Sequence, residues 1–263
     1  MLKIIKQVSL IRATNPAHGN IQTFLEQLVV EVVASNYRYF LNEHLINSVS
    51  DDRQPEARCW PPLLANERQV SGLFANALSS VCPVSRPEFA ILRPGVAGKR
   101  GKVGADRNGR VDFFATYGKR SLALELKQIS ISPLGDAAVR RGLTARWKSV
   151  ERQSAEVLTH LCAYRDYYPH PTSVGLMVIR VSRKVSSKRK PETARSEAAE
   201  QMPSVLQRVR QSIKPDFLAH YVPPLEMQTC LEGGENENEY RVFPGIIFAA
   251  VVHGQQPAKK KKR

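Results

Sequence analysis

The sequence predicts an α/β (α+β) fold in which a mixed sheet is flanked by helices, with a helical extension at the N-terminus. The 263 residues, of which 42% are hydrophobic, suit one large domain, or one domain with an extension. Some segments repeat apolar residues at the spacing of a helix, and others alternate them as strands do. The resulting order of helix, strand, strand, strand, helix and strand favours a mixed sheet covered by helices.

The N-terminal part of the chain is expected to be helical. Residues 20–47 carry an apolar stripe at helical spacing, which predicts a long helix. Residues 51–62 are rich in charge and proline, as linkers are. A second helix is expected over 63–81, followed by a strand at 88–93. The stripe of the first helix consists of Ile21, Phe24, Leu25, Leu28, Val29, Val32 and Val33.

The remaining elements follow from the same patterns. Residues 94–109 contain five glycines and predict a flexible basic loop, and a hairpin turning at Gly118-Lys119 comes next. Further helices are expected over 144–168 and about 203–220, and further strands over 173–181 and about 240–252. We therefore divide the chain into an N-terminal helical extension (1–58), a core (59–255) with a mobile basic insert at about 184–201, and a basic tail (256–263).

Positive charge is concentrated in three short stretches. The net charge is +15, and residues 93–110, 183–190 and 259–263 each contribute +5. Such clusters are typical of proteins that bind a polyanion, so DNA is the expected partner, with RNA as a second candidate. An anionic membrane is not expected, because no apolar helix face adjoins these stretches. The candidate nucleic-acid-binding residues are Lys99, Arg100, Lys102, Arg107, Arg110, Arg183, Lys184, Lys188, Arg189 and Lys190.

The sequence favours a cytoplasmic protein. It has no apolar run of 18 residues, and its first residues do not form a convincing signal peptide. The four cysteines are scattered without a Cys-x-x-Cys motif, which indicates neither a zinc site nor a disulfide framework. The basic tail also resembles a nuclear localisation signal, so a nuclear location is kept as an alternative for a eukaryotic source.

Asp112, Glu125 and Lys127 form the most informative pattern. If the hairpin closes at Gly118-Lys119, Tyr117 pairs with Arg120 and Asp112 lies opposite Glu125. Directly opposed residues have Cβ atoms roughly 4.5–5.5 Å apart, and like charges there are unfavourable. A divalent cation between the carboxylates would offset this cost, and Lys127 would share their face. The alternative is an ordinary hairpin with a polar outer face.

Glu67 is a further acidic residue in an unexpected place. On a helix over 63–81 it would lie in the middle of the apolar stripe, where an unpaired carboxylate costs several kcal/mol. A cation would remove that cost. A salt bridge to a core arginine, or a position at the edge of the sheet, would remove it as well.

The succession Glu67, Asp112 and Glu125-Leu126-Lys127 resembles the PD-(D/E)XK nuclease superfamily, the restriction-endonuclease-like fold, over roughly residues 60–183. The resemblance implies a metal-dependent phosphodiesterase. Asp112 and Glu125 would bind Mg²⁺, or Mn²⁺ in its place, together with the Leu126 backbone carbonyl. Lys127 would orient or activate the attacking water, and Glu67 would support the metal site.

Two positions depart from the family pattern. Val111, rather than proline, precedes Asp112. Some branches carry Gln-x-x-x-Tyr on the following helix, whereas Gln153 is followed here by Val157. Gln153 is therefore kept as a candidate for lining the site, with a solvated surface residue as the alternative.

These observations together predict a Mg²⁺-dependent endonuclease that hydrolyses phosphodiester bonds of DNA, for which defence against foreign DNA is a plausible setting. The alternative is a catalytically silent nucleic-acid-binding or assembly protein with the same fold. The broad apolar stripe over residues 20–47 also makes a homodimer, or a protein partner bound through the N-terminal helix, a candidate arrangement.

Overall fold

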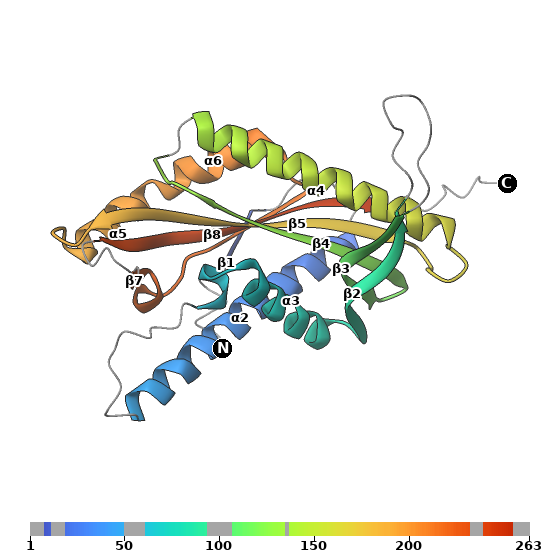
Figure 1. Cartoon of the computed structure of the whole chain (residues 1–263), viewed down its shortest axis with the longest axis horizontal. Coiled ribbons are helices and arrows are strands. Elements are labelled where there is room, and N and C mark those ends of the chain that lie inside the picture. The colour runs from blue at the N-terminus through green and yellow to red at the C-terminus, as the bar shows by residue number, and fades with distance from the viewer. Residues whose placement is uncertain are drawn as a thin grey trace.

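The computed structural model describes residues 8–11, 19–49, 61–93, 107–134, 137–231 and 239–254. Their eight-stranded sheet has the order β1-β6-β8-β5-β4-β3-β2, and β7 pairs with β8 outside this path. Helices α2 and α3 lie on one face of the sheet, and α4 and α6 lie on the other (Figure 1). The predicted mixed sheet with flanking helices is confirmed.

The bounds of the elements are as follows. The strands are β1 (Val8–Ile11), β2 (Val84–Arg93), β3 (Arg107–Tyr117), β4 (Arg120–Ile131), β5 (Thr172–Ser186), β6 (Phe217–Tyr221), β7 (Thr229–Leu231) and β8 (Glu239–Gly254). The helices are α2 (Gly19–Val49), α3 (Glu67–Val81), α4 (Ala137–Ala163), α5 (Pro191–Glu200) and α6 (Met202–Ile213), with short 3-10 turns η2 (Pro62–Leu64) and η3 (Leu225–Met227).

The chain path explains why the sheet is mixed. Strands β2, β3 and β4 form an antiparallel meander, and α4 then returns the chain so that β5 runs parallel to β4. A parallel neighbour requires such a crossover. Strand β8 lies antiparallel between β5 and β6. Both β5 and β8 are covered on two faces, which accounts for their nearly continuous apolar runs.

Apolar side chains fill both sides of the sheet. One core joins the sheet to α2 and α3, and a second joins it to α4 and α6. The N-terminal half of α2 places Phe24, Leu28 and Val32, all fully buried, in the first core. The helix predicted over 20–47 is therefore packed against the sheet and does not lie apart from it.

One sequence prediction on the C-terminal side is wrong. A helix was expected to continue to residue 220, but α6 ends at Ile213. Lys214 there adopts a left-handed backbone (φ 42°), and Pro215 follows it. Phe217–Tyr221 then forms a buried strand, because it completes the sheet beside β8.

The segment 184–201, predicted to be a mobile basic insert, contains regular secondary structure. It contains the end of β5 and all of α5. Ala194 and Ala198 are buried in a small cluster with Val185, Tyr240 and Val242. Small residues on one helix face pack on the sheet here, and the composition of the segment concealed this.

Other predictions lie partly outside the described residues, including most of the linker at 51–62 and of the basic loop at 94–109. Within the described part of the chain, no helix is long and apolar enough to span a membrane.

Candidate functional site

The β3–β4 hairpin has the predicted register. Tyr117 pairs with Arg120 across a turn at Gly118, whose φ of 58° suits glycine, and the paired positions continue to Phe113 and Leu124. Asp112 occupies the next position on β3, and Glu125 occupies the next on β4. The hairpin therefore brings the two acidic positions to the point where the ladder ends.

The Asp112 side chain reaches across this end of the ladder. Its Oδ2 atom accepts a hydrogen bond of 2.7 Å from the backbone N–H of Leu126. The carboxylate thus satisfies a backbone donor that β3 no longer pairs. Because the N–H and C=O groups of one strand residue point to the same side, the Leu126 carbonyl is directed toward the same gap.

Glu125 and Lys127 lie on the face of β4 that α4 covers. Glu125 is only 2% exposed, and Lys127 is half-buried. Glu125 is the partner of Gly175 on β5, and α4 approaches the sheet closely at this point. A Cβ atom on Gly175 would lie 2.5 Å from Val150 Cγ1 and 2.9 Å from Ser154 Oγ. Because residue 175 has no side chain, α4 can pack closely against the sheet at the position of Glu125.

Gln153 lies on the same part of α4. Its Oε1 atom is buried and has no hydrogen-bond partner among the described residues. A buried carbonyl oxygen of this kind normally has a partner in a protein, a water or a ligand. Its position between Val150, which packs beside Gly175, and Val157, which packs near Ala123, places it at the level of Glu125.

The prediction that Glu67 is buried in the apolar stripe is wrong. Glu67 is the first residue of α3 and its side chain is 47% exposed, because Leu63 and Leu64 belong to the separate turn η2. The helix begins at Glu67 because the Asn66 side chain caps it, accepting hydrogen bonds from the N–H groups of Arg68 and Gln69.

Glu67 nevertheless lies beside the open part of the sheet. Its Oε2 atom is 3.6 Å from Nη2 of Arg146 on α4, although α3 and α4 cover opposite faces. The pair can form because β4 beyond Leu124 has Cα partners only on β5 among the described residues. The two side chains therefore meet across the edge of β4 that β3 leaves uncovered.

The sheet holds the start of α3 at this edge. Gln128, which follows Lys127, donates from Nε2 to the carbonyl oxygen of Ala65 at 3.3 Å. Arg180 on β5 donates to the carbonyls of Leu64, at 2.7 Å, and of Ala65. Burial and the nearby Arg241 lower the pKa of Arg180. These contacts fix the position of the start of α3, and therefore of Glu67, relative to Lys127 on β4.

Arg146 is a site residue that the sequence reasoning missed. It precedes Gln153 by seven residues, so two helical turns bring both onto one face of α4. That spacing is the signal in the sequence that identifies it, once Gln153 is considered as a lining residue.

The backbone on the other side of Asp112 is also irregular. Strand β2 pairs Pro87 with Phe113 and Phe89 with Val111, which leaves Glu88 across from Asp112. Glu88 has φ 49°, an uncommon conformation for a residue with a side chain. Asp112 therefore stands between a distortion in β2 and the opening of the β3–β4 ladder.

The donor set fits a magnesium ion only in part. Two carboxylates and a backbone carbonyl are hard oxygen ligands, and Mg²⁺ often binds through one or two carboxylates, waters and substrate phosphates. No further acidic, histidine or cysteine side chain joins the two carboxylates, since within the described ranges no three His, Cys, Asp or Glu side chains gather in a metal-binding arrangement. Glu67, directed to Arg146, is not such a ligand.

Carboxylates accompany many of the predicted nucleic-acid-binding residues. Glu197 pairs with both Arg183, at 3.3 Å, and Arg189. Glu239 is 3.4 Å from Lys184. The sequence analysis selected these basic residues from the clustering of positive charge along the chain. Their acidic neighbours on α5 and β8 are distant in sequence or belong to another element, and they lie beside the basic residues only in the folded structure.

The other predicted cations are placed differently. Arg110 pairs with Glu88 at 2.8 Å, and both side chains are exposed. Lys188 and Lys190 have no carboxylate partner in the part of the chain that the structure describes. Lys99, Arg100 and Lys102 lie outside the described residues, as do the side chain of Arg107 and the basic tail.

Comparisons with protein-family models, with curated proteins and with solved structures find no match to this chain.

Proposed function

We propose that this protein is a divalent-metal-dependent endonuclease that hydrolyses phosphodiester bonds of DNA. The observation that carries the proposal is the contact of the Asp112 carboxylate with the Leu126 backbone, next to the buried Glu125. Asp112 thus contacts the strand segment that carries Glu125 and Lys127, where β3 and β4 separate. The PD-(D/E)XK resemblance assigns roles to the same four residues.

Each residue has a distinct role in this proposal. Asp112, Glu125 and the Leu126 carbonyl would hold Mg²⁺, which as a Lewis acid polarises a phosphate oxygen and lowers the pKa of a bound water. Lys127 would orient the attacking water and stabilise the negative charge that develops on phosphate. The Gln153 side chain would hydrogen-bond to that water or to a phosphate oxygen.

Glu67 and Arg146 would act at the rim of the site. Glu67 would hold the Arg146 guanidinium beside the uncovered edge of β4. A guanidinium can bind a phosphate through two hydrogen bonds, and so could position the scissile strand. Glu67 is then a positioning residue, and it no longer needs to contact the metal.

A protein that binds nucleic acid without cleaving it is the second candidate. One observation favours it: within the described residues, no third His, Cys, Asp or Glu side chain joins Asp112 and Glu125 in a metal-binding arrangement. In that case Asp112 would serve to terminate the hairpin ladder, and the basic residues would account for binding. Salt-dependent affinity without metal-dependent turnover is its expected behaviour.

Cleavage assays distinguish the two candidates. The full chain is incubated with supercoiled plasmid, linear duplex, single-stranded DNA and RNA, with Mg²⁺, with Mn²⁺ and with a chelator. We expect metal-dependent cleavage of DNA that falls at least roughly 100-fold in Asp112→Asn, Glu125→Gln and Lys127→Ala, since removing one group that stabilises the transition state costs about that much. RNA cleavage would widen the substrate class.

Glu226→Gln and Lys148→Ala serve as controls, because both side chains are exposed and lie outside the site. Circular dichroism and thermal unfolding show whether each variant is folded. Asp112→Asn retains an oxygen acceptor for Leu126, which limits structural damage. The nuclease proposal fails if no metal supports cleavage, or if the folded site variants cut as fast as the controls.

A further inference from the structure

A second feature lies on the same face of the hairpin as Asp112 and Glu125. A pocket of about 660 Å³ opens between β2, the turn of the β3–β4 hairpin and the segment that follows α4. Thr116 and Ser121, a cross-strand pair, contribute to it. Ser121 precedes Glu125 by four strand residues, which corresponds to about 13 Å.

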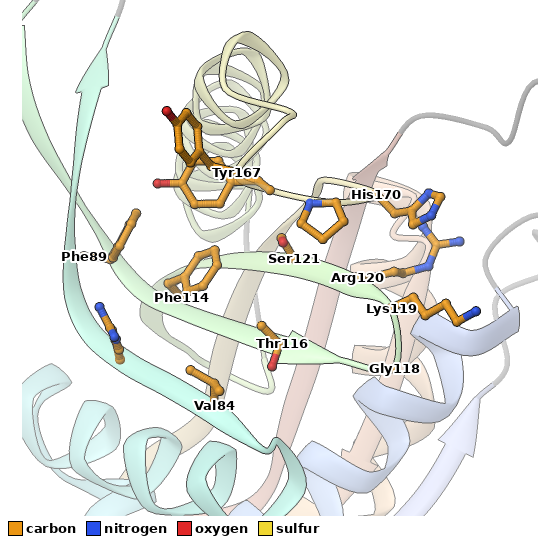
Figure 2. A pocket seen from close by; sticks show the side chains of 13 residues that line it. Val84, Phe89, Phe114, Thr116, Gly118, Lys119, Arg120, Ser121, Tyr167 and His170 are labelled. Carbon is orange, nitrogen blue, oxygen red and sulfur yellow. The ribbon is translucent and has the colours of Figure 1, made fainter.

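Aromatic rings line one end of this pocket (Figure 2). The rings of Phe89 and Phe114 are nearly parallel, with centroids 4.8 Å apart. The ring of Tyr168 contacts both, at 5.5 Å from Phe114 and 6.1 Å from Phe89. These contacts hold the three rings as a wall, whereas Tyr167 beside them is 80% exposed. An exposed ring next to a fixed aromatic wall is suited to stacking on a flat ligand.

The other end is cationic. Lys119, Arg120 and His170 lie together at the end of the pocket away from Phe89 (Figure 2). Arg120 Nη1 donates to Thr172 Oγ1 at 3.3 Å, which orients the guanidinium. Arg86, the β2 partner of Phe114, adds a positive charge at the aromatic end, and no acidic residue is among the described residues that line the pocket. The described residues give none of Lys119, Arg120 and Arg86 a carboxylate partner.

We propose that this pocket binds an unstacked nucleotide of a single-stranded nucleic acid. The base stacks on Tyr167 and the aromatic wall, and its phosphate lies at the end formed by Lys119 and Arg120. Aromatic stacking combined with a positive groove is the general means by which proteins hold single strands. A paired duplex cannot use the wall, because its base faces are covered by neighbouring bases.

The proposal rests on the proposed function and makes it more specific. Anchoring a strand in the pocket would favour a substrate that contains an unpaired segment, such as a single strand, a flap or a frayed end. The pocket would select substrate without taking part in the chemistry.

The test is a binding measurement in a chelator, where no metal-dependent cleavage occurs. The full chain is titrated into a short single-stranded DNA that carries a fluorescent base analogue, and into the matching duplex. We expect tighter binding of the single strand, with quenching of the analogue by stacking. Tyr167→Ala should weaken this binding roughly 5- to 100-fold, the usual effect of losing one stacked base. Tyr167→Phe should bind as the wild type does.

Matched variants separate stacking from charge. Tyr164→Ala removes a neighbouring exposed tyrosine outside the pocket and should leave the affinity unchanged. Lys119→Ala should reduce the dependence of affinity on salt by about one phosphate contact, whereas Arg141→Ala on the exposed side of α4 should not. A mononucleotide competitor tests whether the pocket takes a free nucleotide in preference to a strand.

Several results would overturn the pocket assignment. The first two are equal affinity for single strand and duplex, and no quenching of the base analogue. The others are an unchanged affinity of Tyr167→Ala for the single strand, and complete displacement of the oligonucleotide by a mononucleotide at a comparable concentration. Because no metal is present, a protein that never cleaves DNA can still pass this test. A protein that cleaves but is insensitive to Tyr167→Ala refutes the pocket and leaves the nuclease proposal standing.

Discussion

At the scale of single residues, the buried polar groups of this protein are tied to specific places in the sheet. Asp112 bonds to a backbone amide that would otherwise lack a partner where β3 leaves β4. His220 on β6 is a contrasting case, because its side chain is 7% exposed and its Nε2 atom has no hydrogen-bond partner among the described residues. A buried imidazole in this environment is held in its neutral form.

His220 makes the stability of the protein depend on pH. Burial lowers the pKa of His220 from its ordinary 6.5 to about 4. The unfolded chain therefore binds a proton near pH 6.5, while the folded protein resists protonation until about pH 4. As the pH decreases from 6.5 to about 4, we expect the free energy of unfolding to fall by about 1.4 kcal/mol per pH unit. Below about pH 4 both states are protonated, and this contribution no longer changes.

Urea unfolding at several pH values between 7 and 4 measures this effect. His220→Leu should remove most of the slope, whatever it does to the stability at pH 7. His170→Asn is the control, since His170 is exposed and asparagine tolerates its left-handed backbone. An unchanged slope in His220→Leu would assign the pH dependence to other groups.

At the scale of elements, the start of α3 connects the fold to the candidate site. Asn66 caps the helix, and Arg180 and Gln128 hold the preceding turn on the sheet. The position of Glu67, and through it that of Arg146, depends on these contacts. The helix terminus is thus set by its own cap residue and by groups from two strands.

We expect Asn66→Ala to lower the free energy of unfolding by about 1 kcal/mol, because two helix N–H groups lose their acceptor. Asn66→Ser should restore most of the loss. Asn76→Ala, an exposed substitution within the same helix, should be neutral or slightly stabilising, because alanine has the higher helix propensity. Thermal or urea unfolding of the three variants measures these differences.

At the scale of the whole molecule, the net charge is +15, but the basic side chains are not equally available to bind a polyanion. Arg183 and Arg189 share Glu197, so part of their charge is neutralised within the fold. Lys188 and Lys190, from the same basic stretch, have no such partner in the described residues. The four residues should therefore contribute unequally to binding of a polyanion.

We expect the double variant Lys188→Ala/Lys190→Ala to weaken nonspecific DNA binding and to reduce the slope of log affinity against log salt by up to roughly 0.9 per lost phosphate contact. The double variant Arg183→Ala/Arg189→Ala should mainly reduce stability, because it leaves Glu197 of α5 without these two cations. Fluorescence anisotropy at several salt concentrations tests this. Equal slopes for the two variants would contradict the distinction.

The sequence by itself determined the succession of elements from α2 to β5 and the hairpin register. Periodic apolar residues and a Gly-Lys turn are local signals, and they predicted α2, β3, β4 and the pairing of Tyr117 with Arg120. Spacing along two adjacent strands was enough to place Asp112 and Glu125 one position beyond Phe113 and Leu124, the last pair of the ladder, because strand geometry is regular over a few residues.

Only the tertiary structure decided which faces and partners the remaining residues have. Glu67 is exposed because its helix begins at residue 67, where the Asn66 cap and contacts from the sheet place it. Pro191–Glu200 forms a helix whose Ala194 and Ala198 pack beside β8, and Phe217–Tyr221 is a strand because β8 offers an edge. The partners of Glu67, Arg183 and Gly175 come from other elements, so no local pattern could predict them.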